Sequence, residues 1–223
     1  MKRAFLLLIA VVSSACNPLD TTPQGGPNAR PLTITGTTEN NPGLLTSLSF
    51  TFNNKTVNNV GTLNSNGEVT ARVEASMMAL PPSRRLSEWR AQLGERCDIS
   101  RLFVTRDESY TALTALQFTN GETASEVRAQ TDVRQADGTT LTDRRLFFFT
   151  LGGGTIRGDV NCPATHEAYA FDVQLRPGWN TVHEISTFGL TLKQRGTVQY
   201  VAEPGATYAG RLLVTADNEG DVR

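Results

Sequence analysis

Imidazole and thiol groups are scarce in this chain, which contains two histidines and three cysteines among its 223 residues. The histidines, His166 and His183, are each followed by a glutamate, and neighbouring residues of a strand point to opposite faces. Neither His-Glu pair therefore forms a metal site or an acid–base dyad by itself. We expect no metal and no cofactor, and we expect His183 at the surface.

The motifs of several enzyme classes are also missing. The sequence has no Gly-x-Ser-x-Gly elbow, no His-Glu-x-x-His helix and no Walker loop. Gly152 to Gly154 follow an expected strand but open no helix, which favours a tight turn or bulge over a phosphate cradle. Asp217 to Asp221 carry oxygen ligands without the spacing of a calcium loop, so we expect a frayed tail over 217–223.

An excess of positive charge is absent as well. The chain has 21 basic and 22 acidic residues, for a net charge of −1. Removal of a signal peptide that contains Lys2 and Arg3 would leave 19 basic residues against 22 acidic ones. Because nucleic acid is bound mainly through basic patches on the protein, this balance predicts no nucleic-acid partner.

Only one long apolar run occurs, and it lies at the N-terminus. Ala4 to Val12 is uninterrupted but too short to span a bilayer as a helix, which takes about 20 residues. Lys2 and Arg3 precede it, and the small residues Ser13 to Ala15 follow it. This order is typical of a signal peptide over 1–15, and it predicts export.

The residues Ser13-Ser14-Ala15-Cys16 resemble the lipobox of bacterial lipoproteins. The resemblance implies lipidation of Cys16 with diacylglycerol and acyl chains such as palmitate. It also implies a membrane partner through this anchor and a place in the cell envelope, in the periplasm or on the outer surface. Ser13 departs from the pattern, which usually has Leu or another aliphatic residue there. Ordinary secretion after a cut behind Ala15, with Cys16 as a free thiol, is the alternative.

With Cys16 assigned to lipid, Cys97 and Cys162 remain as an even pair. In an oxidising compartment such a pair predicts a disulfide. The bridge would close a loop of 66 residues and stabilise the fold by about 4 kcal/mol through chain entropy. A metal site is disfavoured because a single distant cysteine pair lacks short ligand spacing.

The remaining composition predicts an all-β fold, mainly an antiparallel sandwich with a barrel as the alternative, and with one short helix. Residues 16–30 are rich in proline and glycine and indicate a flexible tether of about 20 Å reach. From residue 31 to 216 the chain is rich in threonine and alternates with period two. We expect one domain there, with two sub-sheets divided near residue 95.

Individual segments carry the pattern of strands and turns. Asn66-Gly67 predicts a hairpin, and 126–134 alternates as a single amphipathic strand. In Phe147-Phe148-Phe149 at least one ring must point away from the others. The expected helix runs from Ser83, as N-cap, to Leu93, with Trp89 on its buried face. Further strands are expected over these segments: 32–37, 47–52, 69–74, 102–104, 112–118, 141–151, 155–162, 168–176, 179–186, 189–194, 197–202 and 208–216.

Three stretches together resemble uncharacterised exported bacterial lipoproteins that are rich in β-structure. They are the hairpin of Val60 to Leu63 with Asn66 to Val69, the strand Arg157 to Cys162, and the Gly-Trp-Asn hairpin within Asp172 to Val182. The resemblance implies architecture and no chemistry. Glu68-Val69 departs from the family's small polar residue and aromatic, and the last thirty or so residues have no counterpart.

Aromatic residues offer two interpretations. Pro177-Gly178 predicts a type II turn that leads into Trp179, which we expect in the core beside the face of Phe171 and Val173. The alternative is a groove for a sugar or peptide, for which the candidate binding residues lie on four expected strands: Tyr169, Trp179, Tyr200 and Tyr208.

Two hypotheses for function follow. The first is a non-enzymatic lipoprotein whose β domain is structural or binds an envelope protein or wall polymer. The second is a hydrolase of wall or extracellular polymer that uses carboxylates such as Asp132, Asp143 or Asp159. Paired carboxylates about 5–10 Å apart in a groove would favour the hydrolase.

Overall fold

The computed structural model describes residues 30–52, 55–78, 84–120, 123–188 and 196–216, which form a β-rich fold and so confirm the expected fold class. The predicted signal peptide, Cys16, the tether, the N-cap Ser83, the strand at 189–194 and the tail all lie outside these residues. The strands and helices of the described residues are β1 (Leu32–Glu39), β2 (Thr46–Phe52), β3 (Lys55–Leu63), β4 (Glu68–Val73), α1 (Ala75–Met78), β5 (Arg84–Arg85), α2 (Leu86–Gly94), β6 (Asp98–Thr105), β7 (Ser109–Leu113), β8 (Leu116–Asn120), β9 (Thr123–Arg128), β10 (Gln130–Arg134), β11 (Thr140–Thr150), β12 (Gly154–Cys162), β13 (Glu167–Leu175), β14 (Gly178–Phe188), β15 (Gly196–Pro204) and β16 (Thr207–Ala216).

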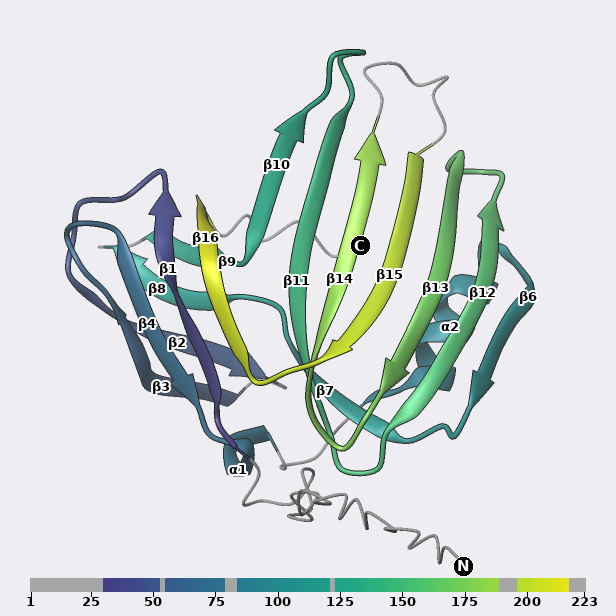
Figure 1. Ribbon diagram of the computed structural model, residues 1–223, viewed down its shortest axis with the longest axis horizontal. Helices are drawn as coiled ribbons and strands as arrows, with labels where there is room; N and C mark the ends of the chain where they lie inside the picture. Colours follow the sequence, from purple (N-terminus) through teal and green to yellow (C-terminus); the bar gives the residue numbers. More distant parts are fainter. Residues whose placement is uncertain (1–29, 53–54, 79–83, 121–122, 189–195, 217–223) are drawn as a thin grey trace, which may run out of the picture.

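Seven strands close into a barrel in the order β1-β16-β9-β8-β2-β3-β4, on the left of Figure 1. Strands β1 and β16 are parallel neighbours, although they begin and end the described fold. Gly36 and Gly210 face each other across this pair, and a Cβ on Gly36 would lie 1.9 Å from the Gly210 carbonyl oxygen. The two backbones therefore approach closely only because position 36 has no side chain.

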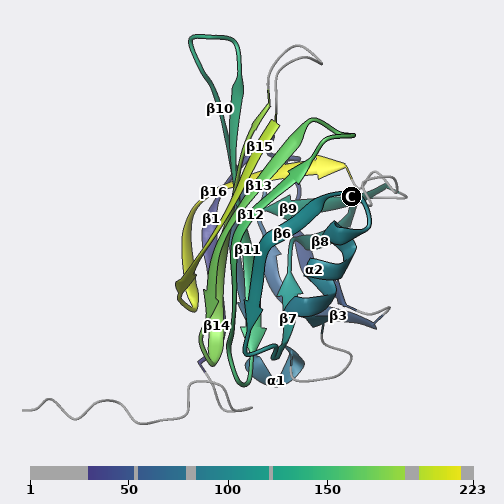
Figure 2. The ribbon, with the colours of Figure 1, turned by 90° about the vertical axis from the view of Figure 1, so that its right-hand side faces the viewer.

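The other strands form a curled sheet in the order β5-β7-β11-β14-β15-β13-β12-β6, with β10 paired to β11. Helix α2 packs on one face of this sheet. In Figure 2, α2 lies to the right of the sheet, and the opposite face points to the left. We call this opposite side the outer face. The two sheets are not divided near residue 95, because β8, β9 and β16 return to the barrel after β6 and β7 have joined the curled sheet.

Strand β11 contributes to two hydrophobic cores. Phe147 and Phe149 pack in the cluster of the barrel, whereas Phe148 packs in the cluster between the sheet and α2. Successive residues of a strand point to opposite faces, so three consecutive phenylalanines can be buried only if both faces are covered. The expectation that one ring points away from the others is confirmed.

Helix α2 buries the face that the sequence predicted. Leu86 is fully buried, and Trp89 packs against Phe148, Phe171 and Tyr200, with ring centroids 6.1, 5.2 and 4.9 Å away. The expected start at Ser83 is wrong, because the helix begins at Leu86.

The first turn of α2 is capped by a side chain from elsewhere in the chain. The Ser87 backbone N–H and Oγ donate hydrogen bonds of 2.8 and 2.5 Å to the carboxylate of Asp107. Asp107 follows β6, so this contact joins the helix to the connection between β6 and β7.

The predicted disulfide joins Cys97 to Cys162, with the Cα atoms 4.2 Å apart. This separation is slightly shorter than the usual range of about 4.4–6.8 Å and far below the 7 Å at which a bridge is excluded. Cys97 follows α2, and Cys162 ends β12. The bridge therefore holds the end of the helix against the sheet that the helix covers.

Three expected strand arrangements are corrected. Segments 112–118 and 126–134 each break into two strands, because the chain crosses between the curled sheet and the barrel after Leu113 and again near Ala129. The Gly-Trp-Asn hairpin is absent: a turn with Gly178 at φ 95° connects β13 to β14, but β15 lies between them.

Candidate functional site

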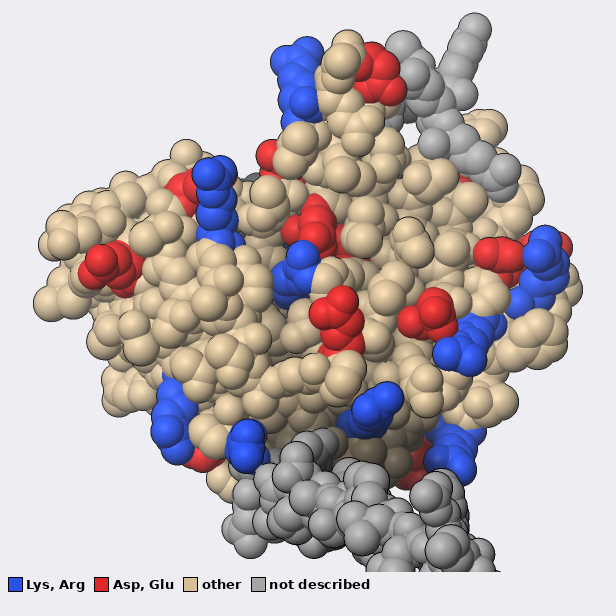
Figure 3. Space-filling view, viewed as in Figure 1, with Lys and Arg blue, Asp and Glu red and all other residues tan. Residues whose placement is uncertain are grey.

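The outer face of the curled sheet carries most of the polar side chains that could form a site. Strand register places Arg145 of β11 beside His183 of β14, and Asp143 beside Ile185. His183 in turn lies beside Val201 of β15. Figure 3 shows acidic and basic side chains interspersed over this face rather than gathered into a patch of one sign.

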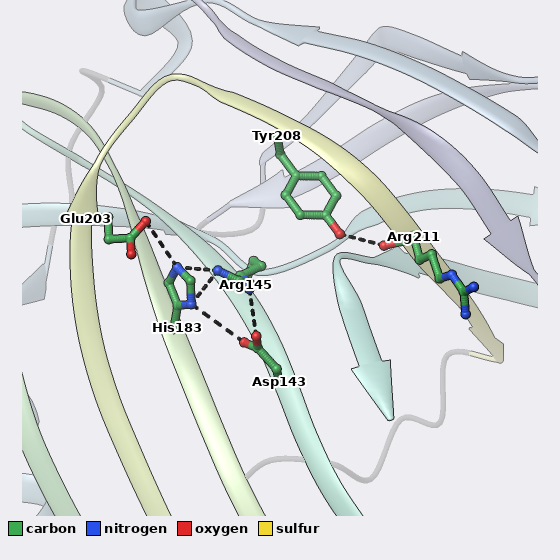
Figure 4. A network of polar contacts seen from close by, with 6 residues as sticks. All are labelled: Asp143, Arg145, His183, Glu203, Tyr208 and Arg211. Carbon is green, nitrogen blue, oxygen red and sulfur yellow. Dashed lines mark hydrogen bonds and ion pairs between the residues drawn. The ribbon is translucent and has the colours of Figure 1, made fainter. Parts of the chain in front are cut away.

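A network of four charged or titratable side chains lies near the barrel on this face (Figure 4). Arg145 donates a hydrogen bond of 2.6 Å to Asp143 and contacts both ring nitrogens of His183. The Nδ1 atom of His183 lies 3.8 Å from the Asp143 carboxylate, and Nε2 lies 3.6 Å from that of Glu203. Neighbouring strands β11, β14 and β15 supply these residues, and we call them the histidine network.

Burial lowers the pKa of His183, and the adjacent Arg145 guanidinium lowers it further, whereas Asp143 and Glu203 act in the opposite direction. The imidazole is therefore neutral at neutral pH, and both of its nitrogens face partners within the network. The His183 side chain is only 13 % exposed, so the expectation of a surface residue is wrong. A histidine held in this way serves to position its neighbours and is poorly placed to exchange protons with a substrate.

Tyr208 extends the same region into the barrel. Its ring lies edge-on to Phe147, with centroids 5.9 Å apart, and its hydroxyl donates a 2.6 Å hydrogen bond to the Arg211 carbonyl (Figure 4). Arg211 forms a 3.2 Å ion pair with Glu39 of β1. Burial raises the pKa of Tyr208, so its hydroxyl stays protonated and acts as a donor.

The aromatic groove proposed from the sequence does not form. Trp179 is buried in the barrel cluster beside Phe149, whereas Tyr200 and Tyr169 pack in the cluster under α2. Tyr200 also donates a 3.2 Å hydrogen bond to Glu184, and burial raises its pKa well above the ordinary value. These rings therefore lie in different layers of the fold and share no exposed face with Tyr208.

The carboxylates proposed for a hydrolase do not converge either. Asp132 accepts a 2.8 Å hydrogen bond from Thr142, which lies on the face opposite Asp143. Asp143 and Asp159 share the outer face, but β14, β15 and β13 separate their strands, a distance of about 19 Å along the sheet. Each of the two is paired with its own arginine, Asp143 with Arg145 and Asp159 with Arg101.

The described ranges contain no cluster of three or more His, Cys, Asp or Glu arranged to hold a metal ion. None of their helices is long and apolar enough to cross a membrane. Gly152 and Gly153 lie in the bend between β11 and β12, in agreement with the turn expected there.

Sequence reasoning missed Arg145, Glu203 and the exposed Phe103, because their positions matter only once the strand order is known.

Comparisons with protein-family models, with curated proteins and with solved structures found no match to this chain.

Proposed function

We propose that this chain is a cell-envelope lipoprotein, anchored through Cys16, whose β domain binds a partner rather than catalysing a reaction. Two sequence features support export and anchoring: the signal-like order of residues 1–15 and the cysteine that follows it. The Cys97–Cys162 bridge supports the same compartment, because disulfides persist in oxidising environments.

The separation of the outer-face carboxylates is the observation that carries the non-enzymatic part of the proposal. Asp143 and Asp159 lie on strands four positions apart, and each already pairs with an arginine. Glycoside hydrolysis requires two carboxyl groups about 5–10 Å apart. Asp143 and Asp159 therefore do not support the hydrolase alternative as its pair of carboxylates.

If the chain is anchored through Cys16, the position of the first described residues determines which end of the domain faces the membrane. Strand β1 begins at the end of the molecule where α1 lies, and the β10–β11 hairpin projects from the opposite end (Figure 1). A tether over 16–30 would hold the α1 end within about 20 Å of the membrane. The hairpin and the upper part of the outer face would then point away from the lipid.

Mass spectrometry of the mature N-terminus tests the anchor. We expect a chain that begins at a lipid-modified Cys16, and we expect Cys16→Ser to move the protein into the soluble fraction. Ser13→Leu is the matched control, because it brings the sequence closer to the lipobox and should leave the modification in place. An unmodified Cys16, or an intact Met1, would contradict the proposal.

A pull-down from native membranes with the lipidated protein tests binding. We expect an envelope protein or a wall polymer to be retained. Hydrolysis of an added wall polymer by the purified chain would instead favour an enzyme.

A further inference from the structure

An open depression lies on the outer face, away from the histidine network. It has a volume of about 570 Å³, and strands β6, β12, β13 and β15 line it. The side chains of Ala168 and Ala170, on β13, form its floor. We call this depression the trough.

Strand register explains why the trough forms here. Ala170 lies between Asp159 of β12 and Gln199 of β15, and Ala168 lies between Asn161 and Thr197 in the same way. Two short side chains therefore occupy the middle strand, and longer side chains stand on both neighbours. Two residues further along β13, beyond the residues that line the trough, Asp172 forms a 2.7 Å ion pair with Arg157.

The walls offer hydrogen bonds without an uncompensated positive charge. Arg101 and Asp159 form an exposed ion pair of 2.9 Å on one wall. A carboxylate can accept several hydrogen bonds and a guanidinium can donate five, so both keep capacity for a ligand while they remain paired. Thr197 and the amide of Gln199, both exposed, stand on the other wall.

The charges and hydrogen-bonding groups of the trough walls favour one class of ligand over others. An anionic polymer would meet one arginine, whose charge Asp159 already balances, together with the carboxylate of Asp98. A cationic ligand would compete with Arg101 for Asp159. Neutral hydroxyl groups both donate and accept, so they can add to the paired ions and to the amide without separating charges.

An exposed aromatic ring lies beside the trough. Phe103 is 64 % exposed and follows Arg101 by two residues on β6. Residues two apart on a strand point to the same face, about 7 Å from each other. The ring therefore offers an apolar surface next to a row of hydrogen-bonding groups, which matches the C–H face and the hydroxyl rim of a sugar ring.

We propose that the trough binds a neutral, hydroxyl-rich carbohydrate chain, with Phe103 as the stacking surface and Arg101, Asp159 and Gln199 as hydrogen-bonding partners. The trough is open to solvent, so an internal segment of a polymer can enter as readily as a chain end. The inference rests on the proposed binding function and names the class of wall polymer that the domain would hold.

Calorimetric titration of the full mature chain carrying Cys16→Ser tests the proposal. The probes are three neutral hexasaccharides (hexa-N-acetylchitohexaose, cellohexaose and maltohexaose) and the anionic hexamer of galacturonic acid. We expect at least one neutral hexamer to bind with a Kd below about 1 mM, and the anionic hexamer to bind at least tenfold more weakly. This chain needs no lipid, so a failure of binding is distinguishable from a failure of the Cys16 anchor.

Two variants locate the binding site, and each has a matched control. Ala170→Leu fills the floor and should weaken binding at least tenfold, whereas Gln174→Leu, exposed on the same strand, should not. Phe103→Ala should weaken binding about fivefold, whereas Leu45→Ala, which removes a side chain that is 75 % exposed elsewhere, should not. Because Phe103 is on the surface, its loss should leave the thermal midpoint unchanged and so report on binding alone.

The proposal is overturned if no neutral hexamer binds at millimolar concentration, or if only the anionic hexamer binds. It is also overturned if Ala170→Leu and Phe103→Ala both bind as the parent chain does.

Discussion

The indole of Trp179 lies edge-on against the ring of Phe149, with centroids 5.3 Å apart and the two planes inclined by 61°. These residues are paired across β14 and β11, and both are buried in the barrel cluster. Trp179 thus belongs to the core, as expected, but to the core on the opposite side of the sheet from Phe171 and Val173. Its Nε1 atom has no hydrogen-bond partner in the described part of the chain.

Replacement of this indole should therefore reduce stability strongly. We expect Trp179→Ala to lower the free energy of unfolding by about 3–5 kcal/mol, the usual range for removing a large buried aromatic. Trp179→Phe should cost clearly less, because it keeps a ring against Phe149 and removes an unpaired N–H. Urea unfolding of both variants measures the difference. An unchanged midpoint in Trp179→Ala would contradict the core position.

Loss of the Cys97–Cys162 bridge should also destabilise the fold. The double variant with both cysteines replaced by alanine should lose about 2–5 kcal/mol, because the unfolded chain regains the freedom of a loop of about 66 residues. Thermal melts with and without reductant provide the control. Reductant should lower the midpoint of the parent chain and leave that of the double variant unchanged.

Asp107 should stabilise the start of α2. Its carboxylate accepts two hydrogen bonds from Ser87 and lies 4.0 Å from Arg85. We expect Asp107→Ala to cost about 1 kcal/mol, as is typical for loss of a helix cap, and Asp107→Asn to cost less. Chemical denaturation measures both changes. Equal losses in the two variants would show that the charge matters more than the acceptor.

The histidine network should make stability depend on pH. Burial and Arg145 lower the pKa of His183 below the ordinary histidine value of 6.5, so the unfolded chain binds this proton more readily than the folded one. Stability should therefore be complete above pH 6.5 and should fall as the pH decreases from 6.5 toward the lower pKa of the folded state.

Titration of the His183 imidazole by NMR tests this prediction. We expect it to titrate below 6.5, and the resonance that disappears in His183→Gln identifies it. The thermal midpoint of His183→Gln should change less between pH 7.5 and 5.5 than that of the parent chain. A His183 resonance that titrates at or above 6.5 would contradict the lowered pKa.

Local features of the fold could be read from the sequence, because each depends on neighbouring residues. The alternation in Leu48 and Phe50 predicts β2, and three adjacent phenylalanines require a strand covered on both sides. Strand order could not be read in this way. The pairing of β1 with β16, or the insertion of β15 between β13 and β14, depends on contacts between segments far apart in the chain.

The candidate sites show the same limit. Ala168 and Ala170 are unremarkable in the sequence, and they form a floor only because β12 and β15 flank β13. His183 meets Arg145 because β14 lies beside β11, although 38 residues separate the two. Side-chain alternation could place such residues on a face, but it could not identify their neighbours.

The parallel pairing of β1 with β16 has a consequence for the order of folding. Strand β16 lies between β1 and β9, so the barrel cannot close until the chain has been made and delivered as far as Ala216. Contacts between residues so distant in the chain slow folding, because the loop-closure entropy must be overcome before they form. A chain threaded through a membrane from its N-terminus would keep its barrel open throughout transit. It would complete the barrel only after Ala216 had crossed.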